Sequence, residues 1–146
     1  MTFVLDNSVA LAWCFADERT PAVMALLDRA IQREAVAPSL WPLEAMNALF
    51  VAQRKRRITE QQRRVLIYDL SILPIEIDHG PQDEGKAASP SAIWRPIDIL
   101  CERYGLTAYD AAYLALALRR RLPLATRDKA LITAARDQGV QLLDTD

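Results

Sequence analysis

The stretch T-F-V-L-D-N-S-V, residues 2–9, decides how the rest of the chain is interpreted. Its apolar residues 3–5 run directly into Asp6, and a short run that is wholly apolar is typical of a strand buried in a parallel sheet. A carboxylate that follows such a strand lies where open α/β sheets bind ligands, outside the carboxyl ends of the strands. We therefore interpret Asp6 as the first of four acids that hold a divalent metal ion.

The composition is typical of one globular domain over residues 1–146. The chain is 51% hydrophobic and 25% charged, which argues against disorder. Its net charge of −1 gives no general attraction to nucleic acid or to a membrane, so any such affinity has to come from a local patch. We expect no signal peptide or membrane span, because the apolar windows carry acids or arginines and the start lacks a basic segment.

The rarer residues exclude several kinds of site. Cys14 and Cys101 lie far apart in apolar, helix-like stretches, so we predict reduced core thiols of a cytoplasmic protein rather than a disulfide. With His79 as the only histidine, neither a histidine-pair nuclease nor a histidine-rich zinc site is possible. No glycine-rich nucleotide loop occurs either. Any enzymatic chemistry would depend on carboxylates, hydroxyls, amides or cations.

The hydrophobic pattern alternates between strand-like and helix-like segments. Such alternation predicts a three-layer α/β/α domain, with a central parallel sheet of about five strands and right-handed crossovers. Strands are expected at residues 3–5, 35–38, 74–78, 122–126 and 140–143, and residues 79–91 have the composition of a loop. Helices are expected at residues 7–15, 20–34, 39–57, 59–72, 92–104, 107–121 and 128–138.

Each acid in a candidate site also has a structural interpretation. Asp6 suits a helix N-cap, although Asn7 or Ser8 would cap that helix as well. Glu44 would be an ordinary exposed acid, except that apolar residues surround it and Asn47 shares its helix face.

The two later acids are equally ambiguous when each is considered by itself. Asp110 follows Thr107 by three residues and so resembles part of a capping box. Asp128 suits a first-turn acid beside a Thr126 cap, while the Thr126 hydroxyl would equally suit a hydrogen bond to metal-bound water.

The set of four acids is more informative than its members. Asp6 and Asp128 follow predicted strands, and Glu44 and Asp110 lie in the first turns of helices, so all four face one rim of a doubly wound sheet. Four like charges need a counter-ion there, because otherwise some would stay protonated. Oxygen ligands without His or Cys favour Mg²⁺ or Mn²⁺ over zinc. Such an ion can activate water for phosphodiester hydrolysis.

These residues resemble the motifs of PIN domains, and more narrowly those of the VapC-type ribonuclease toxins of bacterial toxin–antitoxin pairs. The similarity covers essentially the whole chain, and four motifs in the same order are far more specific than any one of them. The matching segments are V-L-D-N-S-V at 4–9, W-P-L-E-A-M-N-A-L at 41–49, L-T-A-Y-D-A-A-Y-L-A-L-A at 106–117 and L-A-T-R-D at 124–128.

The resemblance implies a Mg²⁺-dependent endoribonuclease, a cognate antitoxin, frequent homodimers and the sheet order 3-2-1-4-5. It implies metal ligation by Asp6 and Asp110, with Glu44 and Asp128 as direct or water-mediated ligands. The side chains that would hold a ligand or a bound water in place are those of Ser8, Asn47 and Thr126. Residues 79–91 depart from the family pattern, since they are longer and more polar than the usual turn.

An acidic pocket repels RNA, so binding needs cations nearby. We predict phosphate contacts from the cluster Arg54, Lys55, Arg56 and Arg57, although basic residues at a helix C-terminus are also favoured by the helix dipole. The three tryptophans would stack on bases or pack in the core.

Two other functions remain open on the sequence. If the four acids are only structural, the protein is instead a catalytically inactive PIN-fold module that binds a small regulatory partner. An aspartyl-phosphate enzyme is disfavoured, because no second acid follows Asp6 two residues later.

Overall fold

The computed structural model describes residues 1–83, 86–87 and 89–146, and a parallel sheet of four strands lies at its centre. The strands lie in the order β3-β2-β1-β6, and every pairing is parallel. Their bounds are Phe3–Leu5 for β1, Ala35–Pro38 for β2, Glu76–Asp78 for β3 and Leu124–Ala125 for β6. The predicted fold class and strand order are confirmed.

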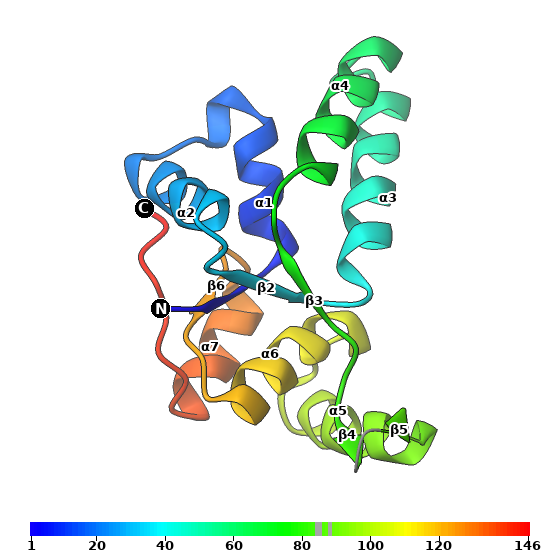
Figure 1. The fold of residues 1–146 in the computed structure, drawn as a ribbon, viewed down its shortest axis with the longest axis vertical. Helices are drawn as coiled ribbons and strands as arrows, with labels where there is room; N and C mark the ends of the chain where they lie inside the picture. Colours follow the sequence, from blue (N-terminus) through cyan, green and yellow to red (C-terminus); the bar gives the residue numbers. More distant parts are fainter. Residues whose placement is uncertain (84–85, 88) are drawn as a thin grey trace.

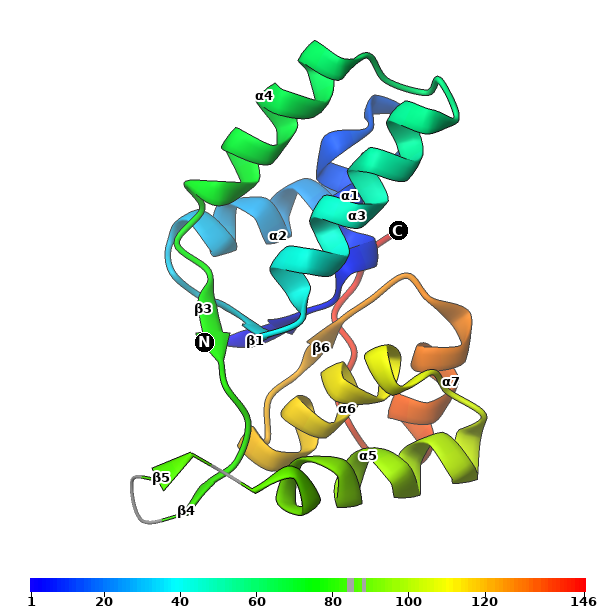
Figure 2. The same cartoon turned by 90° about the vertical axis from the view of Figure 1, so that its right-hand side faces the viewer.

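Helices cover both faces of this sheet (Figure 1). One face carries α1 (Asn7–Cys14), α2 (Pro21–Ile31), α3 (Trp41–Arg54) and α4 (Glu60–Ser71). The other face carries α5 (Pro90–Tyr104), α6 (Ala108–Arg120) and α7 (Lys129–Asp137). A short 3-10 helix, η1 (Ala16–Glu18), follows α1. In the turned view of Figure 2, α3 and α4 project from the sheet as an antiparallel pair.

Two predictions about strands and loops were wrong in detail. Residues 140–143 form no full strand but one parallel bridge, between Leu142 and Leu124, because β6 is only two residues long. The predicted loop 79–91 contains an antiparallel hairpin of β4 (Gln82–Asp83) and β5 (Lys86–Ala87), and its last two residues belong to α5. Residues 84, 85 and 88 of that loop lie outside the described residues.

Helix ends follow local chemistry. At the start of α4, the Thr59 hydroxyl accepts from the Gln62 amide at 3.1 Å, and the Gln62 side chain accepts from the Thr59 amide at 2.9 Å. This reciprocal pair of hydrogen bonds is a capping box. Gly105 ends α5 with φ +66°, a left-handed conformation that glycine adopts without steric cost.

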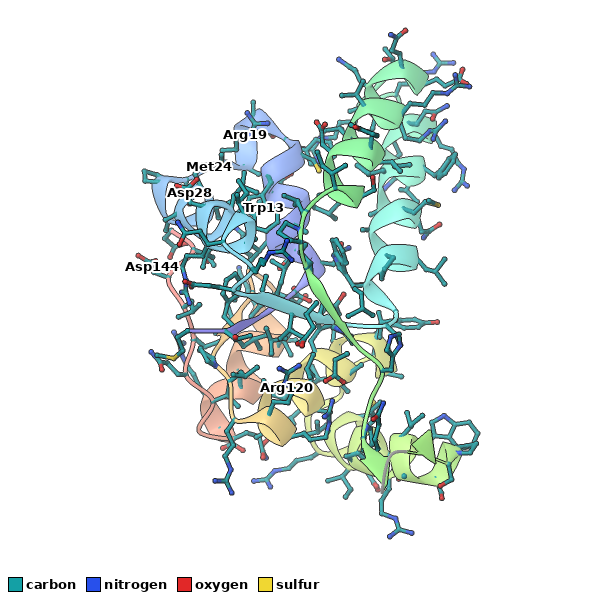
Figure 3. All side chains as sticks on the ribbon, viewed as in Figure 1. Trp13, Arg19, Met24, Asp28, Arg120 and Asp144 are labelled. Atoms are coloured by element: carbon teal, nitrogen blue, oxygen red, sulfur yellow. The ribbon has the colours of Figure 1, made fainter. Side chains whose placement is uncertain are left out.

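The core lies between the sheet and its two helical layers. The side chains of β1 are completely buried, as expected for a central parallel strand. Trp13 packs between α1 and α2, where its indole N–H donates to the Val23 carbonyl at 2.8 Å (Figure 3). Cys14 and Cys101 are free thiols. Within the described ranges, no helix has the length and apolar character needed to cross a membrane.

Candidate active site

Asp6 is the single residue between β1 and α1, and only 3% of its surface is exposed. The Ser8 amide donates to Asp6 Oδ2 at 3.3 Å, so Asp6 itself is the N-cap of α1. Of the three residues that the sequence offers as caps, Asp6 rather than Asn7 or Ser8 therefore caps this helix. The carboxylate is thereby fixed at the carboxyl end of the central strand.

Two hydroxyl groups hold the same oxygen of Asp6. Ser8 Oγ donates to Oδ2 at 2.5 Å and Thr126 Oγ1 donates to it at 2.9 Å. These hydroxyls in turn accept from backbone amides, Ser8 from Arg127 at 2.9 Å and Thr126 from Asp128 at 3.1 Å. The junction after β1 is therefore tied to the junction after β6, and within the described part of the chain nothing donates to Asp6 Oδ1.

Glu44 lies in the first turn of α3, and its carboxylate Oε1 accepts from the Tyr113 hydroxyl of α6 at 2.7 Å. Sequence reasoning missed Tyr113, which lies in the segment 106–117 but was given no role. The available signal was the polar tip of a tyrosine predicted to be buried, since such a group needs a partner. Asn47 is exposed and makes no side-chain hydrogen bond with the described residues, so the structure does not bring it to the acids.

The other two acids lie at helix N-termini: Asp110 is in the first turn of α6, as its structural interpretation predicts, whereas Asp128 is itself the N-cap of α7 in place of the predicted Thr126. The amide of Asp110 donates to Thr107 Oγ1 at 3.1 Å at the start of α6. Asp128 caps α7, and its Oδ1 accepts from the Leu131 amide at 2.9 Å. The first turns of α6 and α7 thus present carboxylates at the same sheet edge as Asp6.

The carboxyl groups influence one another's charge. Burial raises the pKa of Asp6, and the charge of Asp128 raises it further, against the lowering effect of the hydroxyl donors. Burial also raises the pKa of Glu44, with added repulsion from Asp6 and Asp110. The pKa of Asp110 is raised by burial and then by Asp128 and Asp6. Burial and the nearby Glu44 raise the pKa of Tyr113, so its hydroxyl stays protonated.

The donor set fits a hard divalent cation. It consists of carboxylates and hydroxyls, with neither histidine nor thiolate, and its members repel one another in a partly buried place. Among the described residues, no three acidic, histidine or cysteine side chains are already grouped closely enough to chelate a metal ion. The acids are therefore neighbours within the range of charge repulsion, and their role as metal ligands stays a prediction.

The predicted RNA contacts divide into two kinds. Arg54, Lys55 and Arg56 are exposed at the end of α3. Arg57 instead forms ion pairs with Asp17 and Glu18. Its guanidinium carbon lies 3.8 Å from the centre of the Phe15 ring. Arg57 therefore joins the end of α3 to the segment after α1.

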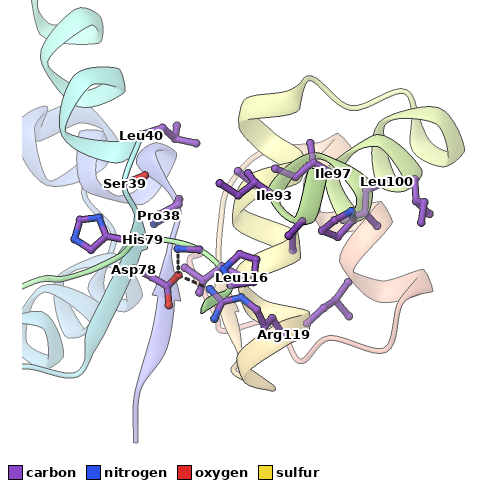
Figure 4. Close-up of a pocket in the computed structure, with 18 of the residues that line it drawn as sticks. Pro38, Ser39, Leu40, Asp78, His79, Ile93, Ile97, Leu100, Leu116 and Arg119 are labelled. Atoms are coloured by element: carbon purple, nitrogen blue, oxygen red, sulfur yellow. Dashed lines mark hydrogen bonds and ion pairs between the residues drawn. The ribbon is translucent and has the colours of Figure 1, made fainter. Parts of the chain in front are cut away.

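The other arginines of interest are also paired. Arg119 and Arg120, at the end of α6, form ion pairs with Asp78, the last residue of β3, and Arg120 also pairs with Glu76. Figure 4 shows the Asp78–Arg119 pair at the edge of a cavity of about 680 Å³ between the end of β3, α5 and α6. Of the tryptophans, Trp13 and Trp41 pack in the core, whereas Trp94 on α5 is 67% exposed.

Comparison with known proteins agrees with this architecture. A family model described as PIN domain matches residues 3–137. FitAcB from Neisseria gonorrhoeae is similar in structure, with a TM-score of 0.66, 19% identity, and coverage of 99% of this chain and 98% of that chain. VapBC2 from Rickettsia felis, solved bound to a promoter DNA fragment, has a TM-score of 0.66 at 14% identity and 97% coverage of each chain.

A toxin–antitoxin complex from Klebsiella pneumoniae has a TM-score of 0.53 at 20% identity, with 87% coverage of each chain. At these identities the similarity shows the fold. A search of curated protein sequences found no match.

Proposed function

The chain belongs to the PIN domain family, and from this premise we propose that it is a metal-dependent endoribonuclease, the toxin of a toxin–antitoxin pair. The observation that carries the proposal is the buried Asp6, held by two hydroxyls and repelled by neighbouring acids at the carboxyl edge of the sheet. The proposed role as a toxin is supported by the similar solved structures, which include VapBC2 and a toxin–antitoxin complex.

In this proposal Asp6 and Asp110 bind Mg²⁺, which Mn²⁺ can replace, and Glu44 and Asp128 bind it directly or through water. A bound divalent cation lowers the pKa of a water molecule and neutralises charge on a phosphate oxygen. Ser8 and Thr126 keep Asp6 Oδ2 fixed, so that Oδ1 remains available as a ligand.

The test of this mechanism is the variant Asp110→Asn, which keeps the size of the side chain and removes one ligand charge. We expect Mg²⁺-dependent RNA cleavage to fall by more than about 100-fold, because losing residues that merely support metal ligands already costs about 10–100-fold. Circular dichroism would verify the fold, and Asp98→Asn on the exposed side of α5 is the matched control. Full cleavage by Asp110→Asn would contradict the mechanism.

One observation favours a second function, an inactive binding module. Asp6 and Asp128 both cap helices, so two of the four acids have a structural role that requires no metal ion. Such a module would neither bind nor be stabilised by Mg²⁺. Sequencing RNA ends after expressing the protein alone, with Asp6→Ala as the control, separates the two functions.

We propose that RNA phosphates contact Arg54, Lys55 and Arg56. This cluster lies about 15 Å from Glu44 along α3, ten residues at about 1.5 Å each, which an RNA strand can span. Replacing all three by alanine should weaken RNA binding and reduce its salt dependence. The control replaces three exposed cations on other elements, namely Arg33, Arg95 and Arg136. Equal losses in both variants would remove the assignment.

The proposed antitoxin surface lies on the α3–α4 pair. Exposed apolar side chains mark it, from Leu43 and Met46 on α3, from Val65 and Tyr68 on α4, and from Ile72 just after α4. A cavity of about 270 Å³ lies between these helices. Large exposed apolar patches of this kind mark protein partners. Val65→Asp should prevent co-purification with the cognate antitoxin and leave RNA cleavage intact.

A homodimer would use the α5 face. Trp94 of this helix is 67% exposed, and Ile93 and Ile97 of the same helix line the 680 Å³ cavity (Figure 4). A twofold interface uses the same patch of both subunits, so an exposed aromatic side chain and an apolar cavity on one helix would suit it. Light scattering should report a dimer for the wild type and a monomer for Trp94→Glu; a monomeric wild type would remove the proposal.

A further inference from the structure

Tyr113 connects two helices that each carry an acid of the candidate site. It lies on α6 one turn after Asp110, and its side chain is fully buried. Its hydroxyl crosses to α3 and donates to Glu44 Oε1 at 2.7 Å. The partners are 69 residues apart in the chain, so this bond exists only because the fold brings α3 and α6 together.

Core packing explains the ring of Tyr113 but not its hydroxyl. A phenylalanine would fill the same space and bury no polar group, whereas a buried phenol needs a hydrogen-bond partner. Here the partner is a carboxylate that faces other acids. The hydroxyl occupies Oε1, and no described residue donates to Glu44 Oε2.

A hydrogen-bond donor of this kind can fix the orientation of a side chain that binds a metal ion. Residues that hydrogen-bond to metal ligands fix their orientation, and they do so best when packing locks their own side chains. The ring of Tyr113 is locked because none of its surface is exposed. Glu44 is only partly buried and would otherwise turn about its side-chain bonds.

We propose that Tyr113 is a positioning residue that holds Glu44 in the orientation needed for a divalent cation, with Oε1 fixed by the hydroxyl and Oε2 left for the ion or its water. This inference rests on the proposed function, in which the acids hold such an ion. It adds a residue outside the four acids and their hydroxyl partners.

The test is Tyr113→Phe, which removes the hydroxyl and keeps the ring. Calorimetric titration with Mn²⁺ should show affinity about 10–100-fold weaker than in the wild type. The KM for RNA should stay the same while kcat falls. Tyr109→Phe is the matched control, on the same helix but 64% exposed, and it should change neither quantity.

A second variant separates positioning from stability. Glu44→Gln should weaken Mn²⁺ binding by itself, and adding Tyr113→Phe to it should cause no further loss, because the hydroxyl acts through Glu44. A purely structural tyrosine would give losses that add, or would lower the melting temperature without changing Mn²⁺ affinity. Either result overturns the inference.

Two further outcomes distinguish this inference from the proposed function. If Glu44→Gln binds Mn²⁺ as well as the wild type does, Glu44 is no ligand and the role of Tyr113 is wrong, while Asp6 and Asp110 still support a nuclease. If the wild type binds no Mn²⁺ at all, both the proposed function and the inference are wrong.

Discussion

Asp6 shows how one carboxylate can cap a helix and still leave an oxygen free for the proposed metal ion. Every hydrogen bond that its carboxylate accepts from the described residues goes to Oδ2, including the one from the Ser8 amide that makes Asp6 an N-cap. The cap and the proposed ligand therefore use different oxygens of one side chain. The choice between cap and ligand, which the sequence presents as an alternative, does not arise in the structure.

The raised pKa values of Asp6, Glu44 and Asp110 predict how the metal-free protein responds to pH. A group whose folded-state pKa is raised contributes stability that is complete below its unfolded pKa and is lost as the pH rises through the folded pKa. The ordinary values are 3.8 for aspartate and 4.5 for glutamate. These carboxyl groups should thus destabilise the fold progressively above about pH 4.

Asp110→Asn tests this repulsion directly. Without metal at pH 7, the variant should melt at a higher temperature than the wild type, because one repelling charge is gone. The difference should close below about pH 4, where the wild-type carboxyl groups are protonated. Thermal melts in a chelator over this pH range provide the measurement, with Asp98→Asn as the control. A variant that melts below the wild type at pH 7 would show that repulsion is not dominant.

Sequence spacing predicts which residues share a helix face but not what that face contacts. Glu44 and Asn47 are three residues apart, yet only Glu44 meets a side chain from another helix. Ser8 and Thr126 lie three residues after β1 and one residue after β6, and both hydroxyls contact Asp6, while their role beside a metal ion stays a prediction. Tyr113 could not be assigned a role, since its partner is 69 residues away.

At the level of elements, helix starts were the most predictable features. Caps such as Thr20, Thr59 and Thr107 act within three residues, so their chemistry is visible in the sequence. The ends of a strand depend on hydrogen bonds to its partner strand, which the sequence does not show. The strand predicted at 122–126 is therefore only two residues long in the structure, and the strand predicted at 140–143 is a single bridge.

The capping box of α4 makes a prediction at this scale. Thr59→Ala should lower the free energy of unfolding by about 1 kcal/mol, the usual value of an N-cap hydroxyl. Chemical denaturation would measure the loss. Cleavage of RNA should not change, because α4 carries none of the four acids. Thr133→Ala on the exposed side of α7 is the control, and an equal loss there would show that capping is not the cause.

For the whole molecule, the alternation of strands and helices predicted the layers correctly, and the resemblance to PIN domains predicted the order of the four strands. Residues 79–91 were not predictable, because neither periodicity nor turn chemistry dominates that segment. The surfaces for partner proteins were not predicted either. A row of apolar side chains on α4 looks the same in the sequence whether the fold buries it or leaves it exposed.

Cation binding should stabilise the whole fold by mass action. At a Mg²⁺ concentration of about 100 times Kd, the free energy of unfolding should rise by about 2.7 kcal/mol, which raises the melting temperature by about 2–4 °C per kcal/mol. Asp110→Asn should show little of this rise. Potassium chloride at the same ionic strength controls for screening. Equal rises in wild type and variant would place the ion elsewhere on the protein.

The junction between β1 and α1 consists of one residue, and this limits how the chain can change in length. Inserting a residue beside Asp6 would turn it by about 100° around the helix or move it to the other side of the strand. The segment between β3 and α5 has no such restriction, since it carries none of the four acids. Insertions and deletions should therefore be tolerated at residues 79–91 and rejected at residues 5–7, which makes the latter the least suitable place to divide or permute this chain.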